Sequence, residues 1–191
     1  MFFLKKPDLK TVREFINSVQ DESFSYPESG ASRVAAPPGY NIDHNRIRLG
    51  VGFDTFTRAS HCLSNWEMFE LGWIELFPTH APIEAGVTVA ILVRHFGFWS
   101  LNASRIVYTI DKDPPVAQYG FAYGTLLSHA EQGEERFTVE HCQTDDSVWY
   151  DLFAFSKPRH FLAAAGYPVS RRLQKRFARE SLEAMWKAVN T

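Results

Sequence analysis

His141 is the side chain in this sequence best suited to acid–base chemistry. It ends the pattern Phe137-Thr138-Val139-Glu140-His141, whose alternation predicts a strand with Phe137, Val139 and His141 on one face. A histidine on an apolar face can orient a polar ligand group or transfer a proton. The same pattern also suits a core histidine bonded to a backbone carbonyl, so both interpretations stay open.

Two carboxylates, Glu134 and Glu135, precede this pattern in a segment that we predict to be a hairpin turn around Gln132-Gly133. Adjacent strand residues point to opposite faces, so the two carboxylates cannot form an acid–base dyad. Glu135 shares its face with His141 and is expected to point toward the mouth of a pocket. The alternative is a solvated turn that carries a weak surface ion pair.

The strand expected at residues 116–127 carries aromatic side chains at alternate positions, and Thr125 and His129 follow before the turn. Its rings project from one face, while Thr125 and His129 are expected to complete a polar cluster with Glu134 and Glu135. No catalytic residue is assigned, and His141 and Glu135 are the candidates. The expected ligand-binding residues are Tyr108, Tyr119, Phe121, Tyr123, Thr125, His141 and Trp149.

Composition limits the classes of function. Of 191 residues, 15% are aromatic, which suits either a thick core or a pocket for an apolar ligand. The net charge of −2 argues against nucleic-acid binding. Neither cysteine lies in a metal or redox spacing, and no signal peptide or membrane span is recognisable. We therefore expect a cytoplasmic protein without integral membrane contact. No phosphate loop or metal motif occurs, so we expect no cofactor and no metal.

A cluster of cations opens the last predicted helix. The helix dipole disfavours positive charge in this first half, so an anionic partner such as an acidic protein, a phosphate or a membrane surface would compensate it. The alternative is a solvated face with ion pairs to Glu180 and Glu183. The cations are Arg171, Arg172, Lys175, Arg176 and Arg179.

The elements that must position these residues follow from periodicity and turn signals. We predict a helix at about 8–20, a proline-rich loop at about 25–44 whose length suggests a flap over an opening, and a strand that ends at Phe53. A helix capped by Asp54 and a short strand ending near Pro78 follow. Strands are then expected at 87–95, 98–111, 116–127, 135–143 and 148–156, with helices at 160–165 and 168–189.

This order predicts an α+β fold in one domain, residues 1–191, with its main body at about 45–191. Short connections favour an antiparallel sheet. A curved sheet wrapped around the long C-terminal helix, with an extra N-terminal helix, would bury every apolar face. The space between the sheet and the long helix is where a ligand would lie.

Several separated stretches resemble signatures of the DUF1990 family, a match that runs from about Tyr26 to Val189. The family in turn resembles the helix-grip superfamily, which includes START domains and the birch-pollen allergen. The resemblance implies a cavity under the C-terminal helix that binds lipids, sterols or polyketides. It brings no catalytic residue, but it draws attention to Gly124, His129, Gly133, Glu134 and Glu135. The stretches are Arg48–Phe53, Tyr123–Leu126, Gly133–Phe137, Ala154–Pro158 and Arg172–Phe177.

Three hypotheses of function follow, in order of preference. The first is a non-catalytic binder of a small apolar or amphipathic molecule. The second is an enzyme for isomerisation, cyclisation or hydrolysis of an apolar substrate, in which His141, Glu135 and a tyrosine transfer protons. The third is an interaction module that uses the cationic helix or the 25–44 loop.

Overall fold

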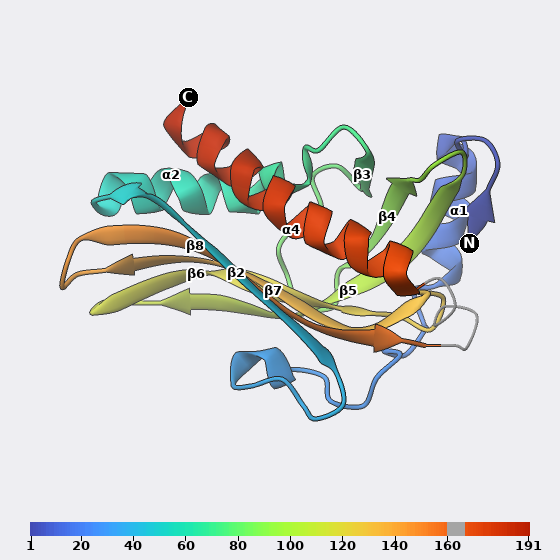
Figure 1. Ribbon diagram of the computed structural model, residues 1–191, viewed down its shortest axis with the longest axis horizontal. Coiled ribbons are helices and arrows are strands. Elements are labelled where there is room, and N and C mark those ends of the chain that lie inside the picture. Colours follow the sequence, from blue (N-terminus) through green and yellow to red (C-terminus); the bar gives the residue numbers. More distant parts are fainter. Residues whose placement is uncertain (160–166) are drawn as a thin grey trace.

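The computed structural model describes residues 1–159 and 167–191, and it has the expected α+β architecture. One large sheet carries two helices on its concave side and one on its convex side (Figure 1). The helices are α1 (Leu9–Ser18), α2 (Phe53–Ser64) and α4 (Tyr167–Asn190), with short 3-10 turns η1 (Ala31–Arg33) and η2 (Glu67–Phe69). The strands are β1 (Phe2–Phe3), β2 (Asn41–Val51), β3 (Ile74–Phe77), β4 (Thr88–Arg94), β5 (Trp99–Lys112), β6 (Val116–Thr125), β7 (Glu131–Cys142) and β8 (Ser147–Pro158).

The sheet is antiparallel throughout and runs in the order β2-β8-β7-β6-β5-β4-β3, with β1 added beside β5. Strands β3 to β8 follow one another as neighbours, as the short connections predict. The sheet curves around α4, which crosses its concave face beside α2 (Figure 1). The helix expected at 160–165 lies outside the described residues.

The main core lies between this concave face and the helices α2 and α4. Phe121, Phe137 and Tyr150 of the sheet are fully buried there, together with Met185 of α4. Trp186, the next residue of α4, is 46% exposed. Neighbouring residues of a helix point about 100° apart, so Met185 and Trp186 cannot both face the sheet.

A second core lies on the convex side, where α1 packs on β4 and β5. Arg105 of β5 ties the end of this helix to the sheet, because its guanidinium donates to the carbonyls of Val19, Gln20 and Glu22. These carbonyls follow the last turn of α1, where the helix provides no partners of its own. The apolar residues of this core are Val12, Phe15, Val19, Ala90, Leu92, Leu101, Ala103 and Leu126.

The 25–44 segment is not a flap over the cavity, and it is shorter than expected because β2 already begins at Asn41. It lies across the sheet from α4 (Figure 1). The buried Glu134 carboxylate holds it there by accepting hydrogen bonds from the Tyr26 hydroxyl (2.6 Å), the Gly30 amide (2.7 Å) and the Ser32 amide (3.1 Å). The anchor explains why Gly124 lacks a side chain, since a Cβ there would lie 2.1 Å from the Tyr26 hydroxyl.

Two predicted boundaries are wrong. Gln132 and Gly133 lie inside β7, and the turn is formed by residues 126–130. Gly133 has φ of +153°, and a Cβ there would lie 2.0 Å from the Phe155 carbonyl, so the glycine reflects close strand packing. The N-cap of α2 is Gly52, and Asp54 lies in the first turn, where its charge still suits the helix dipole.

Candidate ligand cavity

A cavity of about 550 Å³ lies between α4 and the concave face of the sheet. Its walls come from η2, from strands β1 to β8 and from the first half of α4. The volume is within the usual range for small-molecule sites. Apolar side chains form most of the lining: Phe69, Trp73, Ile74, Ile91, Val93, Leu152, Leu173 and Phe177.

Glu135 lines the cavity, and its carboxylate has few groups around it that could balance a negative charge. Its Oε2 accepts a hydrogen bond from the Tyr123 hydroxyl at 2.6 Å, the one contact that the described residues give it. Burial raises the pKa of Glu135 to about 7, although the Tyr123 hydrogen bond lowers it, and the negative charge of Asp43 raises it further. An acid poised near neutrality inside an apolar cavity is a typical feature of functional sites.

A second acidic group of the cavity is partly neutralised. Arg171 of α4 donates to Asp43 of β2 at 2.7 Å, which ties the start of the helix to the edge of the sheet. Burial raises the pKa of Glu131, while a hydrogen bond from Ser170 and the charge of Arg171 lower it. The Oε2 atom of Glu131 is buried and has no hydrogen-bond partner in residues 1–159 and 167–191.

Thr125 and His129 also line the cavity, as the expected polar cluster requires. Thr125 Oγ1 accepts from the Gly133 amide at 2.9 Å, and His129 Nδ1 accepts from the Glu131 amide at 3.0 Å. Burial lowers the pKa of His129 to about 4, so this imidazole is neutral at physiological pH. Glu134 is not part of the cluster, because its side chain points to the convex side.

His141 does not line the cavity. Its Nε2 forms a hydrogen bond with Asp146 Oδ1 at 2.7 Å, and its ring packs against Phe53 and Phe56 of α2. His141 lies six residues after Glu135 on β7, a distance of about 20 Å. The two groups therefore cannot share a proton, and the proposed pairing of His141 with Glu135 is wrong.

Tyr119 and Phe121 lie on the concave face, but beside the cavity rather than in it. Phe121 is fully buried, with its ring centroid 4.7 Å from that of Trp66. Tyr119 is partly buried against the same core, and burial raises its pKa. The aromatic row of β6 thus divides into core positions and one cavity position, Tyr123.

Tyr108 and Trp149 lie on the convex side, which removes them from the candidate cavity. A register shift between Ile106 and Tyr108 places Tyr108 opposite Ala122, and its hydroxyl bonds Ser32 Oγ at 2.6 Å. Trp149 pairs with Glu140 across the strands. Their neighbours in sequence occupy the concave face instead, as strand alternation requires.

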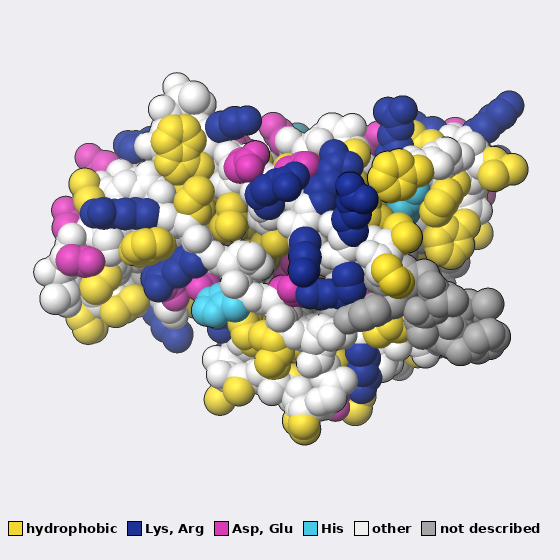
Figure 2. Space-filling view, viewed as in Figure 1, with side chains coloured by type: hydrophobic (Ala, Val, Ile, Leu, Met, Phe, Trp, Pro, Cys, Tyr) yellow, Lys and Arg dark blue, Asp and Glu magenta, His cyan; other side chains and the backbone are white. Residues whose placement is uncertain are grey.

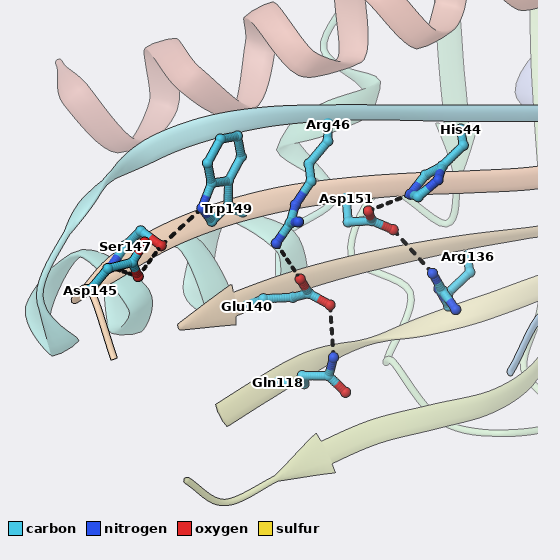
Figure 3. A network of polar contacts seen from close by, with 9 residues as sticks. All are labelled: His44, Arg46, Gln118, Arg136, Glu140, Asp145, Ser147, Trp149 and Asp151. Carbon is cyan, nitrogen blue, oxygen red and sulfur yellow. Dashed lines mark hydrogen bonds and ion pairs between the residues drawn. The ribbon is translucent and has the colours of Figure 1, made fainter. Parts of the chain in front are cut away.

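The convex side carries a polar network that joins four strands (Figure 3). Glu140 accepts from Arg46 at 2.6 Å and from Gln118 at 2.7 Å. Asp151 contacts His44 at 2.6 Å and Arg136 at 3.1 Å. Glu140 and Asp151 each contact a basic group, so this part of the network is a set of cross-strand ties.

Sequence reasoning missed several polar residues of the cavity. His95, Ser100 and Asn102 form a second polar group on its wall, with His95 Nε2 and Asn102 Nδ2 both bonded to Ser100 Oγ. The one signal for them was the alternation of polar residues along the 98–111 strand. Asp43 was missed because the start of β2 is too polar to be recognised as a strand.

Most of the cation cluster on α4 is paired. Arg171 binds Asp43, Arg176 binds Glu180 at 2.8 Å, and Arg179 contacts Glu180 at 3.3 Å. Arg172 and Lys175 are exposed. Lysine and arginine side chains gather along this helix in Figure 2. These ion pairs compensate part of the positive charge of the cluster. An anionic partner for α4 stays a prediction.

Comparison with known protein families shows to which family the chain belongs. Residues 25–184 match the family model "Domain of unknown function (DUF1990)". The chain belongs to the DUF1990 family. A UPF0548 protein of Dictyostelium discoideum is 34% identical, over 100% of this chain and 97% of its own length. One of Deinococcus radiodurans is 34% identical, over 94% of each chain.

Solved structures show the same fold at low sequence identity. Human STARD10 matches with a TM-score of 0.51 and 12% identity, over 97% of this chain and 80% of its own. Ara h 8.0201 matches with a TM-score of 0.50 and 9% identity, over 79% and 98%. These members of the START and birch-pollen-allergen group confirm the predicted helix-grip architecture for this DUF1990 chain.

Within the described residues, no helix is long and apolar enough to cross a membrane. Both cysteines, Cys62 and Cys142, are free thiols. The expected cytoplasmic location stays a prediction.

Proposed function

We propose that this protein binds a small amphipathic molecule between α4 and the concave face of the sheet. The observation that carries the proposal is the cavity of about 550 Å³, whose mostly apolar wall is interrupted by a few polar groups. Such a composition is typical of small-molecule sites, where apolar contacts give affinity and polar groups fix orientation. The helix-grip resemblance supports the same place for a ligand.

The apolar wall would hold the body of the ligand. Phe69, Phe177 and Tyr123 form a connected aromatic group, with ring centroids 5.2 Å apart for Phe69 and Phe177 and 6.3 Å apart for Phe69 and Tyr123. Buried aromatic rings contribute large apolar contact areas. Tyr123 and Glu135 would then orient the polar end, because they lie at the same place on β6 and β7.

A cavity-filling variant tests this proposal. Ala154 lines the cavity from the inner side of β8, so Ala154→Phe is expected to occupy part of the space. We expect a fluorescent apolar dye that binds the native protein to bind this variant at least about tenfold more weakly, since lost contact area lowers affinity. Ala35→Phe, an exposed position near η1, is the matched control and should bind normally. Equal dye binding by the two variants would remove the case for the cavity.

One observation favours a catalytic role as the second candidate. Glu135 has a pKa of about 7, which suits a general acid or base at physiological pH. Proton transfer would then involve Glu135 and Tyr123 rather than His141. The test is to incubate a bound ligand with native protein and with Glu135→Gln, and to follow its conversion by mass spectrometry. Conversion by both proteins, or by neither, counts against the enzyme.

A further inference from the structure

The charges around Glu135 are unbalanced. The groups that face it are Asp43 of β2, Tyr123 of β6 and Tyr150 of β8, and none of these supplies a positive charge. Arg171 of α4 makes two contacts with Asp43. A buried carboxylate is normally paired with a cation or surrounded by several donors. Among the described residues, Glu135 instead has one neutral donor, the Tyr123 hydroxyl.

Glu131 adds a second acceptor on the same side of β7. Both residues line the cavity, and the position between them is Gly133, which has no side chain to separate them. The buried Oε2 of Glu131 has no hydrogen-bond partner among the described residues. Glu131 lies four residues from Glu135, about 13 Å along β7, and it already interacts with Ser170 and with the charge of Arg171. Glu135 is therefore the cavity carboxylate that still needs a cation.

Aromatic rings lie beside these acceptors. Tyr123 donates to Glu135, and its ring is followed by those of Phe69 and Phe177. Aromatic faces attract cations through their quadrupole, and a carboxylate supplies the opposite charge. In the described residues no three His, Cys, Asp or Glu side chains are grouped closely enough to hold a metal ion. Carboxylates beside aromatic rings in an apolar cavity of this size suit an organic cation.

We propose that the ligand carries a protonated amine, which donates a hydrogen bond to Glu135 while its apolar body lies along Phe69 and Phe177. The inference rests on the proposed function of the cavity. An ammonium group supplies both the missing positive charge and a second donor to Glu135, and charge-assisted hydrogen bonds of this kind are strong. A carboxylate or phosphate head group would meet repulsion from Glu135.

A set of probes with one dodecyl chain tests the head group. Binding of dodecylamine, dodecanol and dodecanoate is measured by calorimetry below their aggregation concentrations. We expect dodecylamine to bind about tenfold or more tightly than dodecanol, and dodecanoate to bind most weakly. In Glu135→Gln the preference for the amine should disappear while dodecanol still binds, which also shows that the variant folds. Glu140→Gln, on the convex side of the same strand, is the control and should keep the preference.

The pH dependence provides a second measurement on the native protein. Alkylamines stay protonated well above neutrality, so a change near pH 7 reports the protein. His129 and His95 also line the cavity, but burial lowers both pKa values. With a pKa of about 4, His129 is neutral throughout the range from pH 6 to pH 8. Burial raises the pKa values of Tyr123 and Tyr150, which stay neutral. We therefore expect the amine preference to grow between pH 6 and pH 8, as Glu135 ionises.

The outcomes separate the two proposals. If dodecanol or dodecanoate binds as tightly as dodecylamine, or if Glu135→Gln keeps the amine preference, the amine inference is overturned and the cavity stays a binding site. If none of the three probes binds the native protein, the proposed function itself fails.

Discussion

Glu134 and Glu135 show how neighbouring residues of one type acquire different roles. Glu134 is buried on the convex side and accepts several hydrogen bonds from the 25–34 segment, which makes it a structural anchor. Glu135 lies in the cavity with a single donor. Strand alternation predicted the separation of the two side chains. It could not predict which one would be anchored, because that depends on a loop far away in sequence.

Glu135 should make stability depend on pH. Its pKa is raised to about 7 when folded, from about 4.5, so the folded state holds the proton more tightly than the unfolded state does. Stability is then lost as pH rises from about 4.5 through about 7. We expect Glu135→Gln to raise the free energy of unfolding at pH 8 by about 3 kcal/mol and to have little effect below pH 4.5.

Urea unfolding of both proteins at several pH values measures this difference. His129 contributes the opposite slope, because its lowered pKa destabilises the folded state as pH falls from about 6.5 to about 4. Comparing variant and native protein at each pH cancels that contribution. A pH-independent difference between them would show that Glu135 is not a buried titrating group.

At the scale of elements, α4 both closes the core and roofs the cavity. Its second half packs tightly through Met185 and Val189, whereas its first half lines the cavity through Leu173 and Phe177. Helical periodicity predicted this helix, whose apolar residues form one stripe. It could not predict that the stripe would leave a space under one half, because that depends on the side chains opposite.

Two adjacent residues of α4 test which face of the helix contributes to stability. Met185 is fully buried, while Trp186 is about half exposed. Met185→Ala is expected to lower the free energy of unfolding by about 2–4 kcal/mol, and Trp186→Ala by less than about 1 kcal/mol. Thermal or denaturant unfolding decides between them. A larger effect at Trp186 would mean that α4 is rotated relative to the sheet.

Strand boundaries were predicted well where glycine, proline or aspartate residues lie in a turn, and poorly where these residues lie elsewhere. The loop between β6 and β7 contains no glycine or proline. The turn was therefore predicted at Gln132-Gly133, which lies inside β7. Tyr108 was misplaced because a register shift in β5 reverses the alternation beyond Ile106. Trp149 could have been placed correctly, since Val148 and Tyr150 on either side are both core residues.

At the scale of the whole molecule, the protein is a curved sheet with a different task on each side. The convex side is closed by α1, by the anchored 25–34 segment and by the cross-strand network of Figure 3. The concave side is closed by α2 and α4, and the candidate cavity lies between α4 and the sheet. The family resemblance and the periodicities together predicted this architecture. The cavity residues contributed by β2, β4 and β5 became evident only once these strands were brought together.

A crystal structure of the protein grown with dodecanol tests the central claim most directly. The account predicts density for the alkyl chain between Phe69, Leu152 and Phe177, with the hydroxyl group near Glu135. The contrary result is a cavity closed by these side chains, with no density for the alcohol under α4.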